Sequence, residues 1–228
     1  MYLKCGVFLM FVMLISACKQ TGYEFNSKEV EPIDSISSLD TNLDDTHSNV
    51  GRAIWQKPGL VIEKLGDISD KVIADIGAGT GYFSFKLALK AKKVIAVEIE
   101  QGLLDYIDST KVMLPENKRS RIETRLATPD DPNLKAEEVD IILIINTIAY
   151  IKDLPEYLQT LKKCLKKDGK IMIIDYKMKR LPINSPPKSE RVYLDHLEDV
   201  LIDAGYKLLK VDDTSLDYQY IIKAEKIN

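Results

Sequence analysis

The sequence has little of what a metal site or a disulfide-bonded fold requires. It contains three cysteines and two histidines in 228 residues. Cys5 and Cys18 belong to the first apolar stretch, so the cysteines give no disulfide framework for a folded domain. Cys164 lies in a helical apolar pattern and is predicted to be a buried structural side chain. His47 and His196 are far apart and lack neighbours at ligand spacing, so we predict no metal site.

An excess of basic residues is also missing. The chain has 32 Lys and Arg against 35 Asp and Glu, a formal net charge of −3. Such a balance gives no basic surface for a nucleic acid, and we expect none as partner. The hydrophobic share of 45% is that of an ordinary globular protein, and the length allows one core with a short appendage. We therefore expect one catalytic domain acting on a small molecule.

No hydrophobic run is long enough for a stable transmembrane helix, which needs about 20 residues. The apolar run Cys5–Ile15 follows one early cation, Lys4, as in the core of a signal peptide. It ends in Leu14-Ile15-Ser16-Ala17-Cys18, which resembles the lipobox of bacterial lipoproteins. We predict a signal peptide over 1–17 and a membrane anchor through lipidated Cys18, in the cell envelope. If the signal is not used, the location would be cytoplasmic.

Two segments follow the predicted signal. Residues 18–49 are rich in Ser, Thr, Asn, Asp and Glu and hold few large apolar side chains, so they are predicted to be a flexible polar tether. Residues 50–228 alternate apolar strand patterns with amphipathic helix patterns, as an α/β domain does. This segment is the predicted catalytic domain, and the sequence leaves its oligomeric state open.

A strand, a glycine-rich turn and a helix come in immediate succession. The β-branched run Lys71–Ile76 predicts a buried strand, Gly77-Ala78-Gly79-Thr80-Gly81 follows, and a helix begins at Tyr82. Glycine permits positive φ and lets the backbone approach a ligand closely. A second strand, Lys93–Val97, ends at Glu98, where a carboxylate can hold both hydroxyls of a ribose. The pattern predicts a site for a nucleoside-containing cofactor.

Asp75-Ile76-Gly77-Ala78-Gly79-Thr80-Gly81 together with Glu98 resembles the cofactor-binding motifs of class I S-adenosylmethionine-dependent methyltransferases. The resemblance extends from Trp55 to the C-terminus. Val139–Asn146 is similar to the family's fourth strand, and Leu161–Ile171 to its leucine-rich helix, Asp-Gly turn and fifth strand. Within the family, the chain is most similar to small bacterial menaquinone/ubiquinone-methyltransferase-like enzymes.

The resemblance implies S-adenosylmethionine as cofactor and methyl transfer to an unidentified small-molecule acceptor. It also implies a Rossmann-like, doubly wound and mostly parallel α/β sheet of seven strands in the order 3-2-1-4-5-7-6, with helices on both faces. The cofactor-binding residues that it implies are Asp75, Gly77, Ala78, Gly79, Gly81, Glu98 and Asn146.

One expected cofactor contact departs from the family pattern. The family places an acidic residue for the adenine amino group just after the third strand, which is Arg121–Leu126 here. Thr128 falls at that place, and the nearest acids are Asp130 and Asp131. We assign the adenine contact to Asp130. The alternative is that Asp130 belongs to a solvated loop.

Two other functions remain open at this point. A nicotinamide-dependent oxidoreductase would share the glycine turn, but its fingerprint requires a small residue where Tyr82 stands. A membrane-tethered protein that binds the cofactor without turnover is the other alternative. The predicted signal peptide supports it, because export would separate the domain from the cytosol, where the methyl donor is made.

Substrate contacts are expected beyond the carboxyl ends of the strands. Asn146 and Tyr150 follow the fourth strand and Tyr176 follows the fifth, and these three are the candidates for contacts at the transferred methyl group. Thr147 and Asp175 adjoin them. No catalytic base is assigned.

The two flanking helices add further candidates. Arg52–Leu65 is predicted to form a helical lid, whose Trp55 could close over the site or anchor the core. His196 lies in a predicted helix over Glu190–Ala204 and is expected at the surface.

Overall fold

A computed structural model describes residue 49 and residues 51–227 of the chain. The predicted signal peptide, Cys18 and all but the last residue of the predicted tether lie outside the described residues. Within the described part of the chain, no helix is long and apolar enough to cross a membrane.

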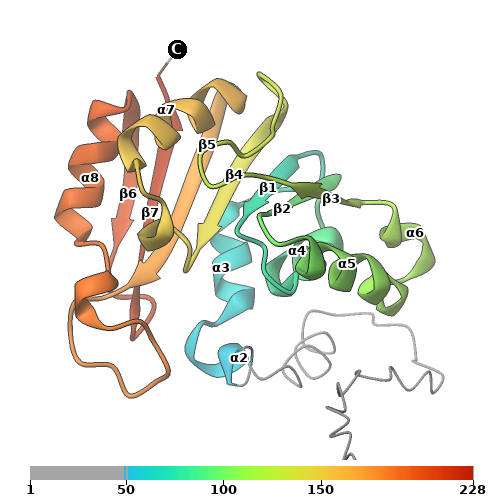
Figure 1. The fold of residues 1–228 in the computed structure, drawn as a ribbon, viewed down its shortest axis with the longest axis horizontal. Coiled ribbons are helices and arrows are strands. Elements are labelled where there is room, and N and C mark those ends of the chain that lie inside the picture. Colours follow the sequence, from blue (N-terminus) through green and yellow to red (C-terminus); the bar gives the residue numbers. More distant parts are fainter. Residues whose placement is uncertain (1–48, 50, 228) are drawn as a thin grey trace, which may run out of the picture. The chain divides into compact units, whose positions relative to one another are not determined.

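Seven strands form a single sheet in the order β3-β2-β1-β4-β5-β7-β6, which confirms the predicted topology (Figure 1). Strands β1 to β5 pair in parallel, and β7 pairs antiparallel with both β5 and β6. The strands are β1 Val72–Ile76, β2 Lys93–Glu98, β3 Ile122–Leu126, β4 Val139–Ile145, β5 Leu165–Tyr176, β6 Tyr206–Asp212 and β7 Gln219–Lys226.

Helices cover both faces of the sheet, as predicted for a doubly wound fold (Figure 1). The α-helices are α2 Arg52–Trp55, α3 Pro58–Leu65, α4 Tyr82–Ala88, α5 Gln101–Thr110, α6 Glu116–Arg119, α7 Leu154–Cys164 and α8 Leu194–Asp203. Short 3-10 turns lie at Lys111–Met113, Ile148–Tyr150 and Lys188–Glu190.

Alternate residues of the central strands enter two separate hydrophobic clusters, since successive side chains of a strand point to opposite faces. Ile73 and Leu143 pack with α3, α4 and α5. Ala74 and Ile142 pack with α7 and α8. Because the central strands are covered on both faces, they read as continuous apolar runs in the sequence. Cys164 is a buried free thiol at the end of α7, as predicted.

The predicted single helix over Arg52–Leu65 is instead two helices, α2 and α3. Lys57 separates them with a left-handed backbone, φ 50°. Lys57 precedes Pro58, and the residue before proline is sterically disfavoured in the α region. The break lets α2 turn away from the axis of α3.

Two other boundaries differ from the prediction. The Asp-Gly turn expected before the fifth strand lies inside β5, where Asp168 has φ 60° and the pairing with β4 shifts register between Val139 and Ile141. The turn is therefore a bulge that bends a longer strand. The last helix, α8, begins at Leu194 and not at Glu190, after the separate 3-10 turn.

Candidate functional site

Three cavities lie at the carboxyl ends of the central strands, and Asn146 lines all three. Their volumes are about 680, 300 and 190 Å³. Asn146 directly follows β4 and has a left-handed backbone, φ 59°. Asparagine tolerates this conformation better than most residues. We call the three the large, middle and small cavities.

The glycine turn after β1 borders the middle and small cavities. Gly77, Gly79 and Gly81 all have positive φ, between 56° and 82°. A Cβ atom built on Gly77 would lie 2.3 Å from Thr147 Oγ1, whereas a Cβ on Gly79 would meet no protein atom within 4 Å. Gly79 therefore faces open space in the small cavity, which it lines together with Ala78.

Glu98 ends β2 and lines the middle cavity. Its side chain is nearly buried, and its carboxylate accepts hydrogen bonds from the backbone N–H groups of Gly79, at 2.9 Å, and Ile99, at 2.7 Å. The end of the second strand and the glycine turn are thereby joined at one carboxylate. This places an acceptor for hydroxyl groups beside a backbone that a ligand can approach.

Residues after β3 close the far end of the middle cavity. Ala127, Thr128 and Pro129 line it, together with Tyr157 of α7. Asp130, the predicted adenine contact, is exposed and is not among the residues that line any of the three cavities. The structure thus brings Thr128, and not Asp130, next to the other predicted cofactor residues.

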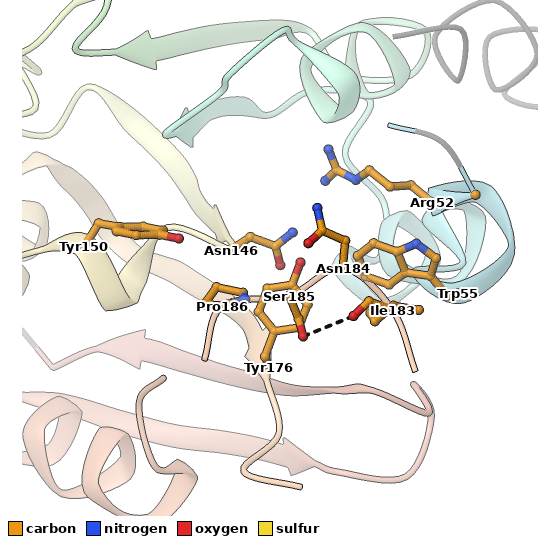
Figure 2. A pocket seen from close by; sticks show the side chains of 10 residues that line it. Arg52, Trp55, Asn146, Tyr150, Tyr176, Ile183, Asn184, Ser185 and Pro186 are labelled. Atoms are coloured by element: carbon orange, nitrogen blue, oxygen red, sulfur yellow. Dashed lines mark hydrogen bonds between the residues drawn. The ribbon is translucent and has the colours of Figure 1, made fainter. Parts of the chain in front are cut away.

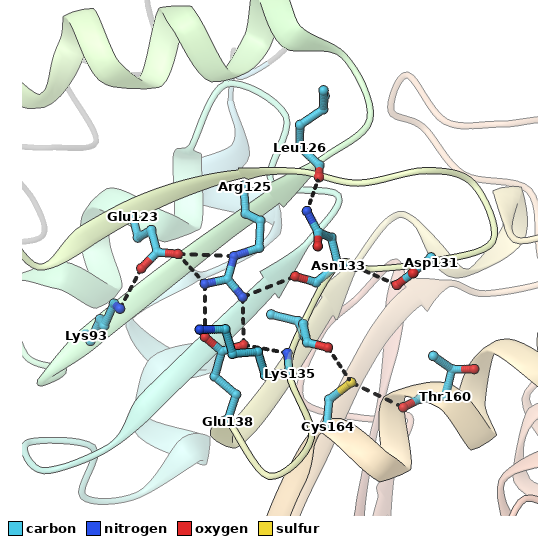
Figure 3. A network of polar contacts seen from close by, with 11 residues as sticks. Lys93, Glu123, Arg125, Leu126, Asp131, Asn133, Lys135, Glu138, Thr160 and Cys164 are labelled. Carbon is cyan, nitrogen blue, oxygen red and sulfur yellow. Dashed lines mark hydrogen bonds and ion pairs between the residues drawn. The ribbon is translucent and has the colours of Figure 1, made fainter.

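A network of ion pairs holds the loop that carries Thr128 (Figure 3). Arg125 of β3 donates to Glu123 and, at 2.7 Å, to Glu138, which lies just before β4. Lys93 of β2 pairs with Glu123 at 2.6 Å. Hydrogen bonding to Arg125 lowers the pKa of Glu138, and hydrogen bonding to Lys93 lowers the pKa of Glu123, so both carboxylates stay charged near neutral pH. Both ends of the loop are therefore fixed to the sheet edge.

The small cavity is lined by two residues from the N-terminal side. Asn49 donates from Nδ2 to Thr80 Oγ1 at 3.2 Å and accepts from Arg52 at 2.9 Å. The Arg52 guanidinium stacks over the ring of Tyr82, 4.3 Å from its centroid. Asn49 is the last residue of the segment predicted to be a tether, and here it is buried against the glycine turn.

Asp75, a predicted cofactor residue, is buried at the end of β1 and lines the small cavity. Ser84 of α4 donates to it from Oγ at 2.6 Å. Burial raises the pKa of Asp75 to about 6. Its carboxylate thus ties α4 to β1 and adds an acceptor to this cavity.

The large cavity has aromatic walls (Figure 2). Trp55 of α2 and Tyr176 of β5 lie with ring centroids 6.1 Å apart, and Tyr150 lines the same cavity while remaining 63% exposed. Burial raises the pKa of Tyr176 to about 12, so its phenol is neutral at pH 7. All three predicted substrate-side residues, Asn146, Tyr150 and Tyr176, therefore line one cavity.

The remaining wall of the large cavity is the loop after β5, residues 177–191, which carries Ile183 to Pro186 (Figure 2). Arg191 holds this loop closed. It donates to the backbone carbonyls of Lys177, Lys179 and Pro186 at 2.7–2.9 Å and to the Ser185 hydroxyl at 3.0 Å. One side chain thus ties this wall of the cavity to both ends of the loop.

Two other residues that the sequence singled out lie away from these cavities. His196 is exposed on α8. Asp175 is buried, accepts from the N–H of Tyr176 at 2.6 Å and has an Oδ2 without a hydrogen-bond partner. Within the described range, no group of three or more His, Cys, Asp or Glu side chains could hold a metal ion.

A model of the family described as "Methyltransferase domain" matches residues 68–223. The chain is 26% identical over 206 residues to the ubiquinone biosynthesis O-methyltransferase of Rickettsia bellii, across 89% of this chain and 78% of that protein. It is also 26% identical over 141 residues to a Dictyostelium discoideum protein described as a methyltransferase, covering 61% of this chain and only half of that protein's length.

Among solved structures, an S-adenosylmethionine-dependent methyltransferase from Aquifex aeolicus superposes with a TM-score of 0.72 at 21% identity. The superposition covers 85% of this chain and 99% of the other. The likeness is one of fold.

Proposed function

This chain belongs to the methyltransferase-domain family and its domain is of the S-adenosylmethionine-dependent class, and from that premise we propose that it transfers a methyl group from S-adenosylmethionine to a small-molecule acceptor. One observation carries the proposal. Asn146 adjoins all three cavities, which is the arrangement needed if one holds the adenosine part of the cofactor, one its methionine part and one the acceptor.

We assign the adenosine part of the cofactor to the middle cavity. Glu98 would accept from the ribose hydroxyls, and Thr128 would border the adenine. The methionine part would occupy the small cavity, next to Asn49, Arg52 and the open face of Gly79. A side chain at position 79 would fill that space. The absence of one on Gly79 therefore leaves room for the cofactor.

When bound, the cofactor supplies a methyl group already activated by its sulfonium, so the chain needs no nucleophile of its own. The protein's part is orientation, which can accelerate such a reaction strongly. The adjacent rings of Trp55 and Tyr176, 6.1 Å apart, would form an apolar wall for a planar acceptor, and the Asn146 amide would fix its polar group. The loop closed by Arg191 would exclude water from the large cavity.

A small molecule is the acceptor that the large cavity fits best. Its volume of about 680 Å³ lies in the range of small-molecule sites. The relative from Rickettsia bellii acts in ubiquinone biosynthesis, which is consistent with such an acceptor. The net charge of −3 argues against an RNA substrate, because affinity for nucleic acids depends on basic residues.

We also propose that the protein is a lipoprotein of the cell envelope, anchored through Cys18. The proposal rests on the apolar run and the motif Leu14-Ile15-Ser16-Ala17-Cys18. Two or three acyl chains anchor a protein stably where one chain is marginal.

Calorimetric titration of the full chain tests the cofactor assignment. Saturable binding of S-adenosylmethionine with no binding of NADH is expected. Binding of NADH alone would favour an oxidoreductase. Binding of S-adenosylmethionine without methyl transfer to any small-molecule acceptor would favour a tethered binding protein.

A further inference from the structure

A chain of side-chain hydrogen bonds runs beneath the large cavity from α2 to the end of β4. Arg52 donates from Nε to Gln56 Oε1 at 2.7 Å, and Gln56 donates from Nε2 to Gln219 Oε1 at 2.9 Å. Gln219 in turn donates from Nε2 to Asn146 Oδ1. Gln56 and Gln219 are completely buried although 163 residues separate them in the sequence.

Arg52 sets the direction of every bond in this chain. A guanidinium can only donate, so the Gln56 group that faces it must be the oxygen. The Gln56 nitrogen then faces Gln219, and the Gln219 nitrogen faces Asn146. At the end of the chain, Asn146 must accept through its oxygen, which leaves its NH₂ group on the cavity side.

The charges around the large cavity favour the same kind of ligand as the Asn146 donor does. Arg52 is the one cation among the described residues that line it, and no carboxylate lines it. In Figure 2 the Asn146 amide lies among these lining side chains, which also include Tyr150 and Tyr176. The cavity therefore combines aromatic walls with an N–H donor, and its lining has no carboxylate that would attract a cationic amine.

We infer that the large cavity selects a planar acceptor that presents an electron-rich oxygen, such as a phenolate, an enolate or a carboxylate, and rejects cationic amines. Gln56 and Gln219 are the positioning residues that turn the Asn146 donor toward it. The inference rests on the proposed function, since it names the acceptor class of the same site. The orientation of the Gln56, Gln219 and Asn146 amides determines whether an oxygen or an ammonium group binds.

Three probes of one shape test the inference: benzoate, which only accepts hydrogen bonds, benzamidine, which only donates them, and neutral acetophenone, which accepts without charge. The full chain is first saturated with S-adenosylhomocysteine, which has no methyl group to transfer, and binding of each probe is followed by calorimetry. Benzoate is expected to bind about tenfold or more tightly than benzamidine, the usual size of one charge-assisted hydrogen bond.

Gln56→Glu reverses the direction of the chain. The new carboxylate stays ionised beside Arg52 and can only accept, so Gln219 must turn its nitrogen toward position 56. Asn146 would then donate to Gln219 and present its oxygen to the cavity. Benzoate and acetophenone should both bind more weakly and benzamidine more tightly. Gln101→Glu adds the same charge on an exposed turn of α5 and should change none of the three affinities.

Three results for the parent chain would overturn the acceptor class. They are equal affinities for the probes, a preference for benzamidine, and no saturable binding of any probe. If Gln56→Glu leaves acetophenone binding unchanged, charge alone explains the selectivity and the positioning role is wrong. Gln56→Met keeps the shape without the polarity, so nothing fixes the direction of the Gln219 and Asn146 amides, and acetophenone should bind more weakly even if the Glu variant does not fold. Failure to bind S-adenosylhomocysteine would count instead against the proposed function.

Discussion

The backbone N–H of Gly79 donates to the Glu98 carboxylate at 2.9 Å, and this bond joins the turn after β1 to the end of β2. The two residues lie 19 positions apart in the sequence, yet they meet where the middle and small cavities adjoin. The carboxylate therefore serves both the turn and the space beside it. Its replacement should affect cofactor binding more than folding.

Replacing Glu98 with alanine should weaken S-adenosylmethionine binding by about 1–3 kcal/mol, the usual cost of leaving hydroxyl groups without a charged partner. Calorimetry of the full chain measures the change, and thermal melting checks that the variant is folded. The Glu98→Gln variant keeps an acceptor but loses the charge. Its affinity for S-adenosylmethionine should lie between those of the parent chain and the alanine variant. Parent-like affinity in a folded alanine variant would remove Glu98 from the site.

Gly79→Val should abolish cofactor binding, because its side chain would occupy the open face of the turn. The matched control is Gly66→Val. Gly66 also has positive φ and open space around its Cβ position, but it ends α3 and lines none of the three cavities. Gly66 has φ 82° and ψ −151°, a conformation almost restricted to glycine, so its valine variant should carry at least as much backbone strain as Gly79→Val. Both variants should therefore melt at lower temperature, and only Gly79→Val should lose binding. Equal binding in both would contradict the placement of the turn.

The sheet could be predicted from the sequence because its pattern is local. Continuous β-branched runs such as Val139–Ile145 indicate strands covered on both faces, and the glycine turn marks the first crossover. The break at Lys57 and the bulge at Asp168 were not predicted. Each depends on a single backbone conformation that tertiary packing decides.

Burial raises the pKa of Asp175 to about 6, above the ordinary value of 3.8. The folded protein thus holds this proton more tightly than the unfolded chain, so the free energy of unfolding should fall as pH rises from about 4 to about 6. The contribution is at most about 3 kcal/mol, from 1.36 kcal/mol per pKa unit. Asp175→Asn cannot titrate and should lose less stability over that range.

Urea unfolding at several pH values compares the two proteins. A change in the free energy of unfolding that the new amide itself causes is the same at every pH. The comparison therefore uses only the slope of the free energy of unfolding against pH. Parallel stability curves for the parent and Asp175→Asn would show that this carboxyl titrates normally.

Cys18→Ser should abolish lipid attachment and leave residues 1–17 uncleaved, if the segment is a lipoprotein signal. Intact mass spectrometry of the native protein gives the answer directly. The expected species begins at Cys18 and carries acyl chains. A protein that still begins at Met1 without a lipid adduct would contradict the envelope location and favour the cytoplasm.

The site itself was only partly predictable. Asn146, Tyr150 and Tyr176 could be named because side chains at the carboxyl ends of parallel strands meet at one edge of the sheet. Asn49, Gln56 and Gln219 were missed because their roles depend on contacts between distant segments. The one available signal was polarity at Gln219, which opens a strand whose next three residues are buried and apolar.

A crystal structure of the full chain with S-adenosylmethionine would show which cavity holds each part of the cofactor. The ribose hydroxyls are expected at Glu98 in the middle cavity, and the methionine part beside Arg52 in the small cavity. The sulfonium methyl group should point past Asn146 into the large cavity. A cofactor bound with its methyl group turned away from Tyr176 and Trp55, or bound outside these cavities, would contradict this assignment.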